Sequence, residues 1–420
     1  MRNIRLNVKP LRRLMDTQPP LTLLCISCYF KGTDFLEVAA ASGNKVYLLT
    51  SRNLEHKPWP RNALSDIFFV DEPDDMTWNM ERIANELAGF LRHERIDRFI
   101  ALDDFDVERV AYLREVFRVP GMGSTTARYF RDKLAMRLKA EEAAIPVPPF
   151  CASFNDAAIN AYTETHNAPW LIKPRSQASA TGIQKANNHA ELWEKLHELG
   201  DKRHEYLIEK FSPGTVYHVD SITRGGEVLF SRTSGYLDTP MEVAHGGGIF
   251  RSQTLELGSE EDLALQEINK QVLQGFGMRD GVSHTEFIRS ATTGEFLFLE
   301  TSARVGGAHL AEMVEAASGI NLWREWAKME TALAQGLPYT PPEPQTFHAG
   351  IVVSLSRFEK PDMNRFVDPE ICWRLEKAYH IGMIVRSENP QRVHELLDNY
   401  AAHIARDFHA SLPSAPRPTD

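Results

Sequence analysis

Cysteine is scarce in this sequence, with 4 residues in a chain of 420. Two of them, Cys25 and Cys28, form a CxxC motif inside the apolar run LTLLCISCYF. That run is typical of a β-strand, where residues three apart point to opposite faces, and no second cysteine pair is present to complete a zinc site. We therefore predict reduced thiols in a reducing compartment, and neither a redox pair nor a zinc centre.

Long apolar runs and an excess of basic charge are missing as well. No apolar stretch is long enough to cross a bilayer. The sequence contains 47 Lys and Arg residues and 57 Asp and Glu residues, which gives a net charge of -10. An acidic chain without an extended basic run is a poor electrostatic match for nucleic acid. The basic start, MRNIRLNVKPLRRLM, precedes only a short apolar run that lacks a small-residue cleavage site, which does not fit a signal peptide. We expect a cytoplasmic protein that binds neither nucleic acid nor a membrane.

The first part of the chain contains short apolar runs that alternate with helix-like segments. The runs are LTLLCISCYF, NKVYLLT, DIFFV and RFIAL. This alternation predicts a small domain with a parallel sheet, of the α/β class. Asp103, Asp104 and Asp106 follow the last run, at the end of the sheet where such domains bind ligands. The same three residues are equally consistent with a strand end followed by a helix N-cap.

Two lysines lie where phosphate could be bound. Lys133 is part of a helix-like segment that Pro146 blocks from continuing. Lys173 ends a strand-like run, and the loop of small residues that follows it up to Gly182 lets backbone N–H groups approach phosphate oxygens. This loop has neither the glycine spacing of a P-loop nor that of a dinucleotide-binding fold. Further along, HGGGI at residues 245–249 has the backbone freedom of a mobile loop that could close over a reaction intermediate.

The segment HTEFIRSATTGEFLFLETSARVGG, residues 284–307, contains two strand-like runs joined by Ala-Thr-Thr-Gly. A chain reversal there sets Glu286 directly against Glu300, and like charges facing each other destabilise a hairpin. Two carboxylates held close in a partly dry place share either a proton or a cation. Magnesium fits the second case, because it accepts a few carboxylate oxygens and completes its octahedron with water and nucleotide phosphates. An ordinary hairpin whose glutamates splay outward is the alternative.

The face that carries the two glutamates also carries other side chains. Strict alternation places Ile288, Phe296 and Phe298 on it, which predicts that the face is covered by protein. Along the second strand the same face continues through Ser302 to Arg304, which adds a polar ligand and a fixed cation beside the proposed metal.

The order of these motifs resembles the ATP-grasp superfamily over nearly the whole chain. The motifs are the helix lysine, IPVPPF, the strand lysine with its small-residue loop, IEKF, HTEF and LETSARVGG. The resemblance implies α/β and α+β parts, with a nucleotide held between two lobes. The implied divisions are an N-terminal tail at 1–20, a parallel α/β domain at 21–125, a small ATP-grasp lobe at 126–204, a catalytic lobe at 205–345, a C-terminal lobe at 346–410 and a disordered tail at 411–420.

The resemblance also implies roles for individual residues. The implied ATP-binding residues are Lys133, Lys173, Ser179, Gly182, Glu209, Lys210, Phe211 and Ser212, of which the last four form the hinge that binds adenine. The implied ligands of Mg²⁺, or of Mn²⁺ as an alternative, are Glu286, Glu300 and Ser302. The implied catalytic residues are Arg304, Glu286 and Glu300. The implied substrate contacts are Arg304, Gly306, Gly307, His309 and His284.

Two positions depart from the pattern of the superfamily. Where many members have a glutamate for the ribose hydroxyls this chain has Val216, so Asp220 or His218 are the candidate substitutes. Where many members have asparagine as a third metal ligand this chain has Ser302, whose hydroxyl is a weaker ligand that binds through water or not at all. The HTE and E-T-S-A-R motifs look closest to those of the bacterial L-amino acid ligases.

The reaction implied by the superfamily is phosphorylation of a carboxylate by ATP, followed by attack of an amine on the acyl phosphate. For this chain it implies an ATP-dependent ligase that joins small-molecule carboxylates and amines, such as two amino acids. The sequence leaves the oligomeric state open, and a homodimer is the default of the superfamily. One alternative keeps the fold but changes the acceptor, as in biotin-carboxylase-like or purine-biosynthetic enzymes. Another is an ATP-binding module that has lost catalysis and acts as a regulator.

Overall fold

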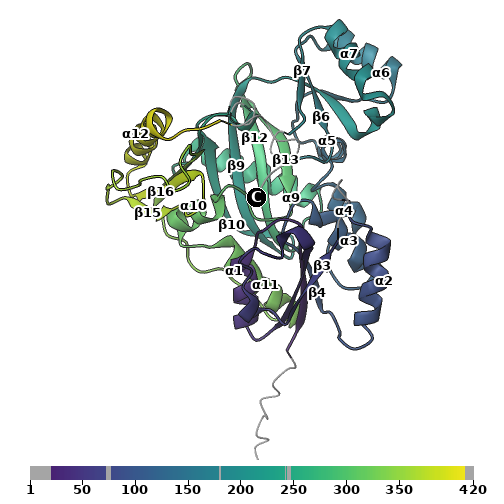
Figure 1. The fold of residues 1–420 in the computed structure, drawn as a ribbon. Helices are drawn as coiled ribbons and strands as arrows, with labels where there is room; N and C mark the ends of the chain where they lie inside the picture. Colours follow the sequence, from purple (N-terminus) through teal and green to yellow (C-terminus); the bar gives the residue numbers. More distant parts are fainter. Residues whose placement is uncertain (1–19, 72–76, 179–180, 242, 244–246, 412–420) are drawn as a thin grey trace, which may run out of the picture.

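The computed structural model describes residues 20–71, 77–178, 181–241, 243 and 247–411. An N-terminal α/β domain, a small α+β lobe and a large lobe follow one another along the chain (Figure 1). Most of the two predicted tails, together with Ser179 and His245, lies outside the described residues. Within the described part, no helix is long and apolar enough to cross a membrane.

The N-terminal domain is built on a four-stranded parallel sheet with the strand order β3-β2-β1-β4. Its strands are β1 (Thr22–Ser27), β2 (Lys45–Ser51), β3 (Asp66–Val70) and β4 (Arg98–Ala101). Its helices are α1 (Thr33–Ala41), α2 (Met80–Phe90) and α3 (Asp106–Phe117), with short 3-10 helices η1 (Arg52–Leu54) and η2 (Arg61–Ala63). The strand β1 is buried along its whole length, as is typical of a parallel strand covered on both faces. The predicted parallel α/β domain is confirmed.

The CxxC motif spans the end of β1. Cys25 packs into a hydrophobic cluster on one face of the sheet, whereas Cys28 packs into the cluster on the other face. All four cysteines are unpaired. The alternation argument that excluded a redox pair therefore holds.

The small lobe contains a four-stranded sheet with the order β5-β8-β6-β7. Its elements are α4 (Ser124–Arg128), α5 (Lys133–Glu142), β5 (Phe150–Ala152), α6 (Asp156–Thr165), β6 (Trp170–Pro174), β7 (Gln184–Ala186), α7 (His189–Leu199), η3 (Gly200–Glu205) and β8 (Tyr206–Lys210). The side chains of Asn155 and Asn188 cap α6 and α7 by accepting backbone N–H bonds in the first turn. Because β8 pairs with β5 and β6, the predicted lobe boundary between residues 204 and 205 falls one strand too early.

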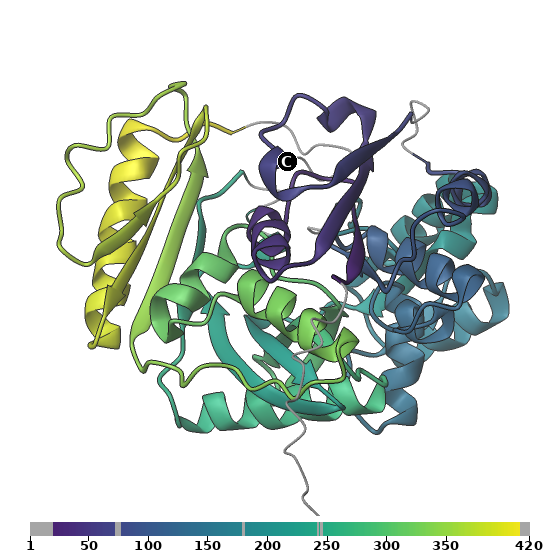
Figure 2. The same ribbon diagram turned by 90° about the horizontal axis from the view of Figure 1, so that it is seen from below.

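The large lobe is organised around an eight-stranded sheet with the order β13-β12-β9-β10-β11-β14-β16-β15. Its strands are β9 (Gly214–Arg224), β10 (Glu227–Tyr236), β11 (Phe250–Thr254), β12 (Gly281–Ser290), β13 (Phe296–Ser302), β14 (His348–Leu355), β15 (Ile371–Arg374) and β16 (His380–Ser387). Its helices are α9 (Glu260–Gly275), α10 (Leu310–Ser318), α11 (Leu322–Ala334) and α12 (Pro390–Asp407). The helix α12 covers one face of β14 and β16 (Figure 2). The predicted separate C-terminal lobe is therefore an extension of the catalytic sheet, joined to it by the pairing of β11 with β14.

The N-terminal domain is anchored to the large lobe through α11. One hydrophobic cluster contains residues of β1 and α1 together with Ile222 of β9, Val282 of β12 and Trp326 of α11. The buried guanidinium of Arg98 also pairs with Glu330 of α11, with an N–O distance of 2.7 Å. This shared core fixes the carboxyl end of β4 beside the large sheet, which positions the aspartates that follow it.

Candidate active site

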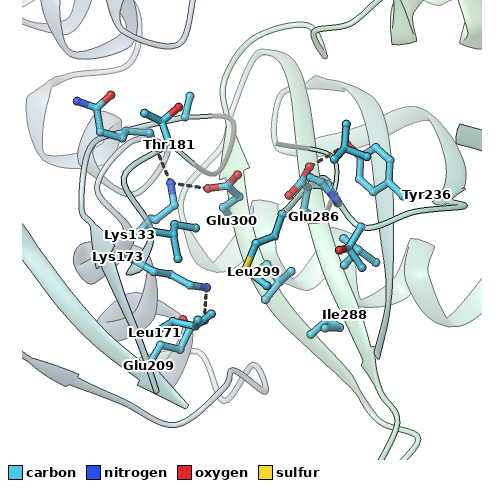
Figure 3. Close-up of a pocket in the computed structure, with 18 of the residues that line it drawn as sticks. Lys133, Leu171, Lys173, Thr181, Glu209, Tyr236, Glu286, Ile288, Leu299 and Glu300 are labelled. Atoms are coloured by element: carbon cyan, nitrogen blue, oxygen red, sulfur yellow. Dashed lines mark hydrogen bonds and ion pairs between the residues drawn. The ribbon is translucent and has the colours of Figure 1, made fainter. Parts of the chain in front are cut away.

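A cavity of about 480 Å³ lies where the three parts of the chain meet. Its charged lining residues are Asp104 of the N-terminal domain, Lys133, Lys173 and Glu209 of the small lobe, and His284, Glu286, Glu300 and Arg304 of the large lobe. In Figure 3, Lys133 and Lys173 approach the cavity from the small lobe and Glu286 and Glu300 from the large lobe, with Lys133 joined to Glu300 and Lys173 joined to Glu209. The structure therefore brings together the lysines, glutamates and arginine that the sequence had singled out.

The strands β12 and β13 pair with Glu286 directly opposite Glu300, as the sequence predicts. A bulge then interrupts the pairing, because Phe287 is opposite Phe298 and Leu299 is the extra residue. The predicted face was wrong beyond this point. Phe298 turns into the core beneath the sheet, as does Phe296, whereas Leu299 lines the cavity together with Ile288.

Each hairpin carboxylate has a partner within the protein. The Nζ of Lys133 lies 2.6 Å from Oε2 of Glu300. Oε1 of Glu286 accepts a hydrogen bond of 2.8 Å from the hydroxyl of Tyr236 and lies 3.5 Å from Nε2 of His284. The sequence predicted that a shared proton or a metal offsets the repulsion between Glu286 and Glu300. In the structure Lys133 and His284 also offset it.

Burial and hydrogen bonding set the ionisation of this part of the site. Burial raises the pKa of Glu286, but the interaction with His284, the hydrogen bond from Tyr236 and the charge of His218 together outweigh it, and the net pKa of Glu286 is lowered. Burial alone lowers the pKa of His284, but the Asp220 carboxylate outweighs it and raises the pKa of His284 to about 9. An anionic Glu286 therefore faces a cationic His284 near neutral pH.

Asp104 reaches from the N-terminal domain into the cavity. It accepts a hydrogen bond from the hydroxyl of Ser302, and its Oδ2 lies 3.7 Å from Arg304 and 3.8 Å from Arg131. Burial opposes the charge, but the two arginines hold the pKa of Asp104 well below its usual range. The Ser302 hydroxyl proton is therefore used by Asp104, which leaves the oxygen lone pairs of Ser302 as its available ligand atoms.

The other two aspartates of the run serve local structure. Asp103 accepts from the backbone N–H of Phe105 at 3.0 Å and pairs with Lys31 at 2.5 Å. Asp106 accepts from the backbone N–H of Cys28 at 2.8 Å. Asp104 lines the cavity, whereas Asp103 and Asp106 stabilise the strand end, and no side chain caps α3 in the way the N-cap interpretation predicts.

Lys133 is placed by the start of α5. Asp132 caps this helix by accepting from the backbone N–H of Leu134, and its carboxylate also pairs with Arg175 at the end of β6. The backbone N–H of Lys133 donates to the carbonyl of Arg175 at 2.9 Å. The Nζ of Lys133 also donates to the carbonyl of Gln177 at 2.7 Å, so that α5 and the loop after β6 form one wall of the cavity.

Lys173 is held by the carboxylate of Glu209, which also pairs with Arg137. The Nζ of Lys173 donates to Oε1 of Glu209, and Arg137 pairs with Oε2 of the same carboxylate at 2.6 Å. Arg137 is fully buried and also donates to the carbonyl of Leu299 at 2.6 Å, which links the small lobe to the bulge of β13. The Glu209 side chain, which the sequence placed at the hinge, thus positions a lysine within a buried ion-pair network.

The hinge differs from its predicted form at two amides. The backbone N–H of Lys210 donates to the carbonyl of Pro149 at 2.8 Å, and that of Phe211 donates to the carbonyl of Pro169 at 3.1 Å. These two amides are used within the small lobe rather than offered to a ligand. The Lys210 side chain bonds to the carbonyl of Asn167, while Phe211 and Ser212 line the cavity beside an apolar wall that consists of Leu171, Ile183, Val216, Ile288 and Leu299.

Of the three glycines that the sequence analysis placed in the site, only Gly307 is part of the cavity lining. Gly182 has a φ of 73°, which favours glycine, and lies between Thr181 and Ile183 of the cavity lining. Gly307 lines the cavity, and Gly306 packs so closely on the large sheet that an added Cβ would lie 2.8 Å from Oδ1 of Asp220. Close backbone approach therefore explains glycine at position 306.

Three residues for which the sequence predicted a substrate or ribose contact do not line the cavity. His309 begins α10, where its ring lies 4.7 Å from that of Trp373 and its Nδ1 lies 3.1 Å from Glu312. His218 and Asp220 are fully buried behind His284. The structure therefore does not support His309 as a substrate contact, or His218 and Asp220 as ribose ligands.

Tyr236 is a polar cavity residue that the sequence analysis did not single out, and the contacts of Asp104 were not predicted either. Tyr236 contacts Glu286 because β10 and β12 both flank β9, an arrangement that no local pattern reveals. Asp104 was noted only as part of an acidic run, since its contact with Arg304 joins residues that are 200 positions apart.

Comparisons with known proteins agree with this architecture. No protein-family model matches the chain. The chain is 27% identical over 266 residues to an L-arginine-specific L-amino acid ligase of Bacillus subtilis, which covers 61% of this chain and 62% of that protein. The chain thus spans a little under two thirds of the length of this curated relative.

Two solved structures share the fold over nearly the whole chain. The crystal structure of an L-amino acid ligase from Bacillus licheniformis matches with a TM-score of 0.71 at 18% identity, over 95% of this chain and 100% of that chain. An N5-carboxyaminoimidazole synthetase from Staphylococcus aureus, complexed with ADP, matches with a TM-score of 0.68 at 17% identity, over 91% of this chain and 96% of that chain.

The chain has the ATP-grasp fold, with a preceding parallel α/β domain, which confirms the resemblance drawn from the order of its motifs. Within that fold it is similar to the L-amino acid ligases.

Proposed function

We propose that this protein is an ATP-dependent ligase that joins two amino acids through an acyl phosphate. The observation that carries the proposal is the convergence of two lysines, two facing glutamates and a partly buried arginine on one cavity: Lys133, Lys173, Glu286, Glu300 and Arg304. Similarity to an L-arginine-specific L-amino acid ligase and to a solved L-amino acid ligase supports the choice of amino acids as substrates.

The proposed reaction has two steps. An oxygen of the first amino acid's carboxylate bonds to the γ-phosphorus of ATP while the bond from that phosphorus to the β–γ bridging oxygen breaks, and ADP leaves. The amine nitrogen of the second amino acid then bonds to the acyl carbon, loses a proton, and displaces inorganic phosphate. No bond to the protein forms, so the residues of the site contribute binding, orientation and charge.

The side chains divide into phosphate, metal and substrate contacts. Lys133 and Lys173 bind the phosphates of ATP in this proposal, and Arg304 clamps the substrate carboxylate and the acyl phosphate with its planar fork. Glu286 and Glu300 offer hard carboxylate oxygens on facing strands, a donor set that fits Mg²⁺ or Mn²⁺. A bound metal would neutralise charge on the transferred phosphoryl group.

The cavity also suggests which side chain the first amino acid carries. Figure 3 shows Tyr236 on the far side of Glu286 from Lys133. The Tyr236 ring lies 5.7 Å from that of Phe250, and the cavity lining also includes the apolar residues Pro240, Met241, Val243 and Leu310. Among the described residues, each carboxylate of the lining already faces a cation of the protein: Asp104 faces Arg304, Glu209 faces Lys173, Glu286 faces His284 and Glu300 faces Lys133. We therefore propose an apolar side chain, in contrast to the arginine named for the Bacillus subtilis relative.

Amino acid pairs mixed with ATP and Mg²⁺ test the function and its specificity together. We expect phosphate release to require two amino acids and to equal dipeptide formation, measured by mass spectrometry. With leucine or methionine as the carboxylate donor, kcat/KM should exceed that with arginine by at least about tenfold, the discrimination that an apolar pocket can provide.

The same assay separates the alternatives. Phosphate release with bicarbonate in place of an amino acid would favour a carboxylase-like enzyme. ATP binding without any turnover would favour an inactive regulatory module. A preference for arginine would contradict the apolar subsite while leaving the ligase proposal intact.

Replacement of Lys173 tests the nucleotide site. We expect Lys173→Ala to weaken binding of an ATP analogue by about tenfold to a hundredfold, because a charged contact to phosphate contributes about 1.5 to 3 kcal/mol. The fold should persist, since Glu209 keeps its pairing with Arg137. Lys210→Ala is the matched control, because the Lys210 ammonium bonds to Asn167. Equal affinity of Lys173→Ala and the parent in calorimetry would remove Lys173 from the site.

A further inference from the structure

A row of buried polar side chains lies behind Glu286: His284, which lines the cavity, is followed by Asp220, His218 and Ser252, which do not line it. The two oxygens of Asp220 each hold a histidine: Oδ1 lies 2.9 Å from Nδ1 of His284, and Oδ2 lies 2.8 Å from Nδ1 of His218. The far nitrogen of His218 lies 2.8 Å from the hydroxyl oxygen of Ser252. His218, Asp220 and Ser252 are 0% exposed, so this part of the row is sealed from solvent.

The row ends on one oxygen of Glu286. Nε2 of His284 lies 3.5 Å from Oε1 of Glu286, and the Tyr236 hydroxyl donates to the same oxygen at 2.8 Å. His218 packs against both supports of Oε1, because its ring lies 4.8 Å from that of Tyr236 and 5.2 Å from that of His284. Because Oε1 is held from two sides, Oε2 is the oxygen that this carboxylate can present to the cavity.

Strand register and the following loop fix this arrangement. In the pairing of β12 with β9, His284 is opposite Asp220 and Glu286 is opposite His218, so all four side chains share one face. Gly306 closes over them, since an added Cβ would lie 2.8 Å from Oδ1 of Asp220 and 3.0 Å from Nδ1 of His284. The backbone that leads into the proposed substrate loop therefore rests directly on the Asp220–His284 hydrogen bond.

These residues could themselves be taken for a metal centre, because ligand atoms of His218, Asp220 and His284 lie within 4.8 Å of one another. The geometry favours hydrogen bonds instead. Each histidine faces a different oxygen of Asp220, and the second nitrogen of His218 is engaged by Ser252. Proton-mediated contacts thus account for the nitrogens of His218 and for both carboxylate oxygens of Asp220.

We propose that Asp220 is a positioning residue that acts through His284 to aim Glu286 at the metal bound with ATP. The proposal rests on the proposed function insofar as it takes Glu286 to be a metal ligand. Hydrogen-bonded supports behind metal ligands commonly change metal affinity by about tenfold to a hundredfold when they are removed. Asp220 touches neither the cavity nor a substrate, so its effect should appear in metal binding before nucleotide binding.

The test compares Asp220→Asn with Asp262→Asn. Asp262 is a matched control, because it is also buried and hydrogen-bonded to the sheet, at 2.5 Å to the Thr233 hydroxyl, but it belongs to α9 on the opposite face. Mn²⁺ is titrated in the presence of a non-hydrolysable ATP analogue and followed by electron paramagnetic resonance. We expect Asp220→Asn to weaken Mn²⁺ binding by about tenfold or more, to leave metal-free analogue binding unchanged, and to lower kcat more than it raises KM. Asp262→Asn should leave Mn²⁺ affinity unchanged.

Tyr236→Phe keeps the test valid if Asp220→Asn fails to fold, since it removes only the second support of Oε1. It should produce the same selective loss of Mn²⁺ affinity. Unchanged Mn²⁺ affinity in the folded variants would overturn the proposal, and so would an equal loss of metal-free analogue binding. If the parent protein binds Mn²⁺ and the analogue but ligates nothing, the positioning role survives on the Mn²⁺ data while the proposed function fails.

Discussion

Glu300→Gln is expected to abolish ATP-dependent ligation while the protein stays folded. The substitution keeps the size and the hydrogen-bonding capacity of the side chain but removes a charged ligand for the metal. Without that charge, negative charge on the transferred phosphoryl group is poorly neutralised, and turnover should fall by at least about a hundredfold, the scale of losing one electrostatic contact to the transition state. Dipeptide formation under saturating substrates is the measurement.

The stability of Glu300→Gln should change little. Lys133 loses its partner, but Glu300 has a side chain that is 32% exposed, and exposed or partly exposed ion pairs contribute about 0 to 1 kcal/mol. Glu295→Gln is the control, because this glutamate is exposed in the same hairpin. Ligation by Glu300→Gln at the parent rate would remove Glu300 from the metal site.

Arg304→Lys is expected to bind ATP almost normally and to lose most of its dipeptide product. Lysine keeps the charge but loses the planar fork, a change that is not conservative where two oxygens are clamped at once. The ion pair of Arg304 is with Asp104, at 3.7 Å, so the loss should not arise from a disturbed metal carboxylate. We expect kcat to fall, KM for the carboxylate donor to rise, or both.

Nucleotide affinity and product yield should be measured on the same preparation of this variant. Arg289→Lys is a suitable control, because Arg289 lies on the neighbouring strand and pairs with Glu261 at the surface. Weak ATP binding combined with near-normal turnover at saturation would contradict the clamp and would place Arg304 in the nucleotide site.

Local pattern accounts for the parts of the site that lie on one hairpin. The alternation of residues and the Ala-Thr-Thr-Gly turn were enough to set Glu286 against Glu300. They were not enough to reveal the bulge at Leu299, which depends on contacts from outside the hairpin: the Leu299 carbonyl accepts from Arg137 of the small lobe, and the Phe298 amide donates to Pro146. A pattern of period two contains no information about those partners.

The remaining differences arise from long-range pairing. Strand β8 reads like the start of a new lobe, but it completes the small sheet between β5 and β6. Ser302 occupies the position of a metal ligand in the motif, yet its hydroxyl donates to Asp104, which belongs to another domain. Tyr236 shows no local signal at all. Such contacts depend on which strands become neighbours, and a single sequence predicts that less well than it predicts the strands themselves.

Formation of an acyl phosphate is the step that most directly defines the proposed reaction, and oxygen transfer from the carboxylate to phosphate tests it. The carboxylate donor is supplied with both carboxylate oxygens replaced by a heavy isotope, and the released inorganic phosphate is analysed by mass spectrometry. If the γ-phosphoryl group is transferred to the carboxylate, each turnover must leave one heavy oxygen in phosphate, with ADP as the other product. Label that appears in AMP, or phosphate released without label while dipeptide accumulates, would contradict the account.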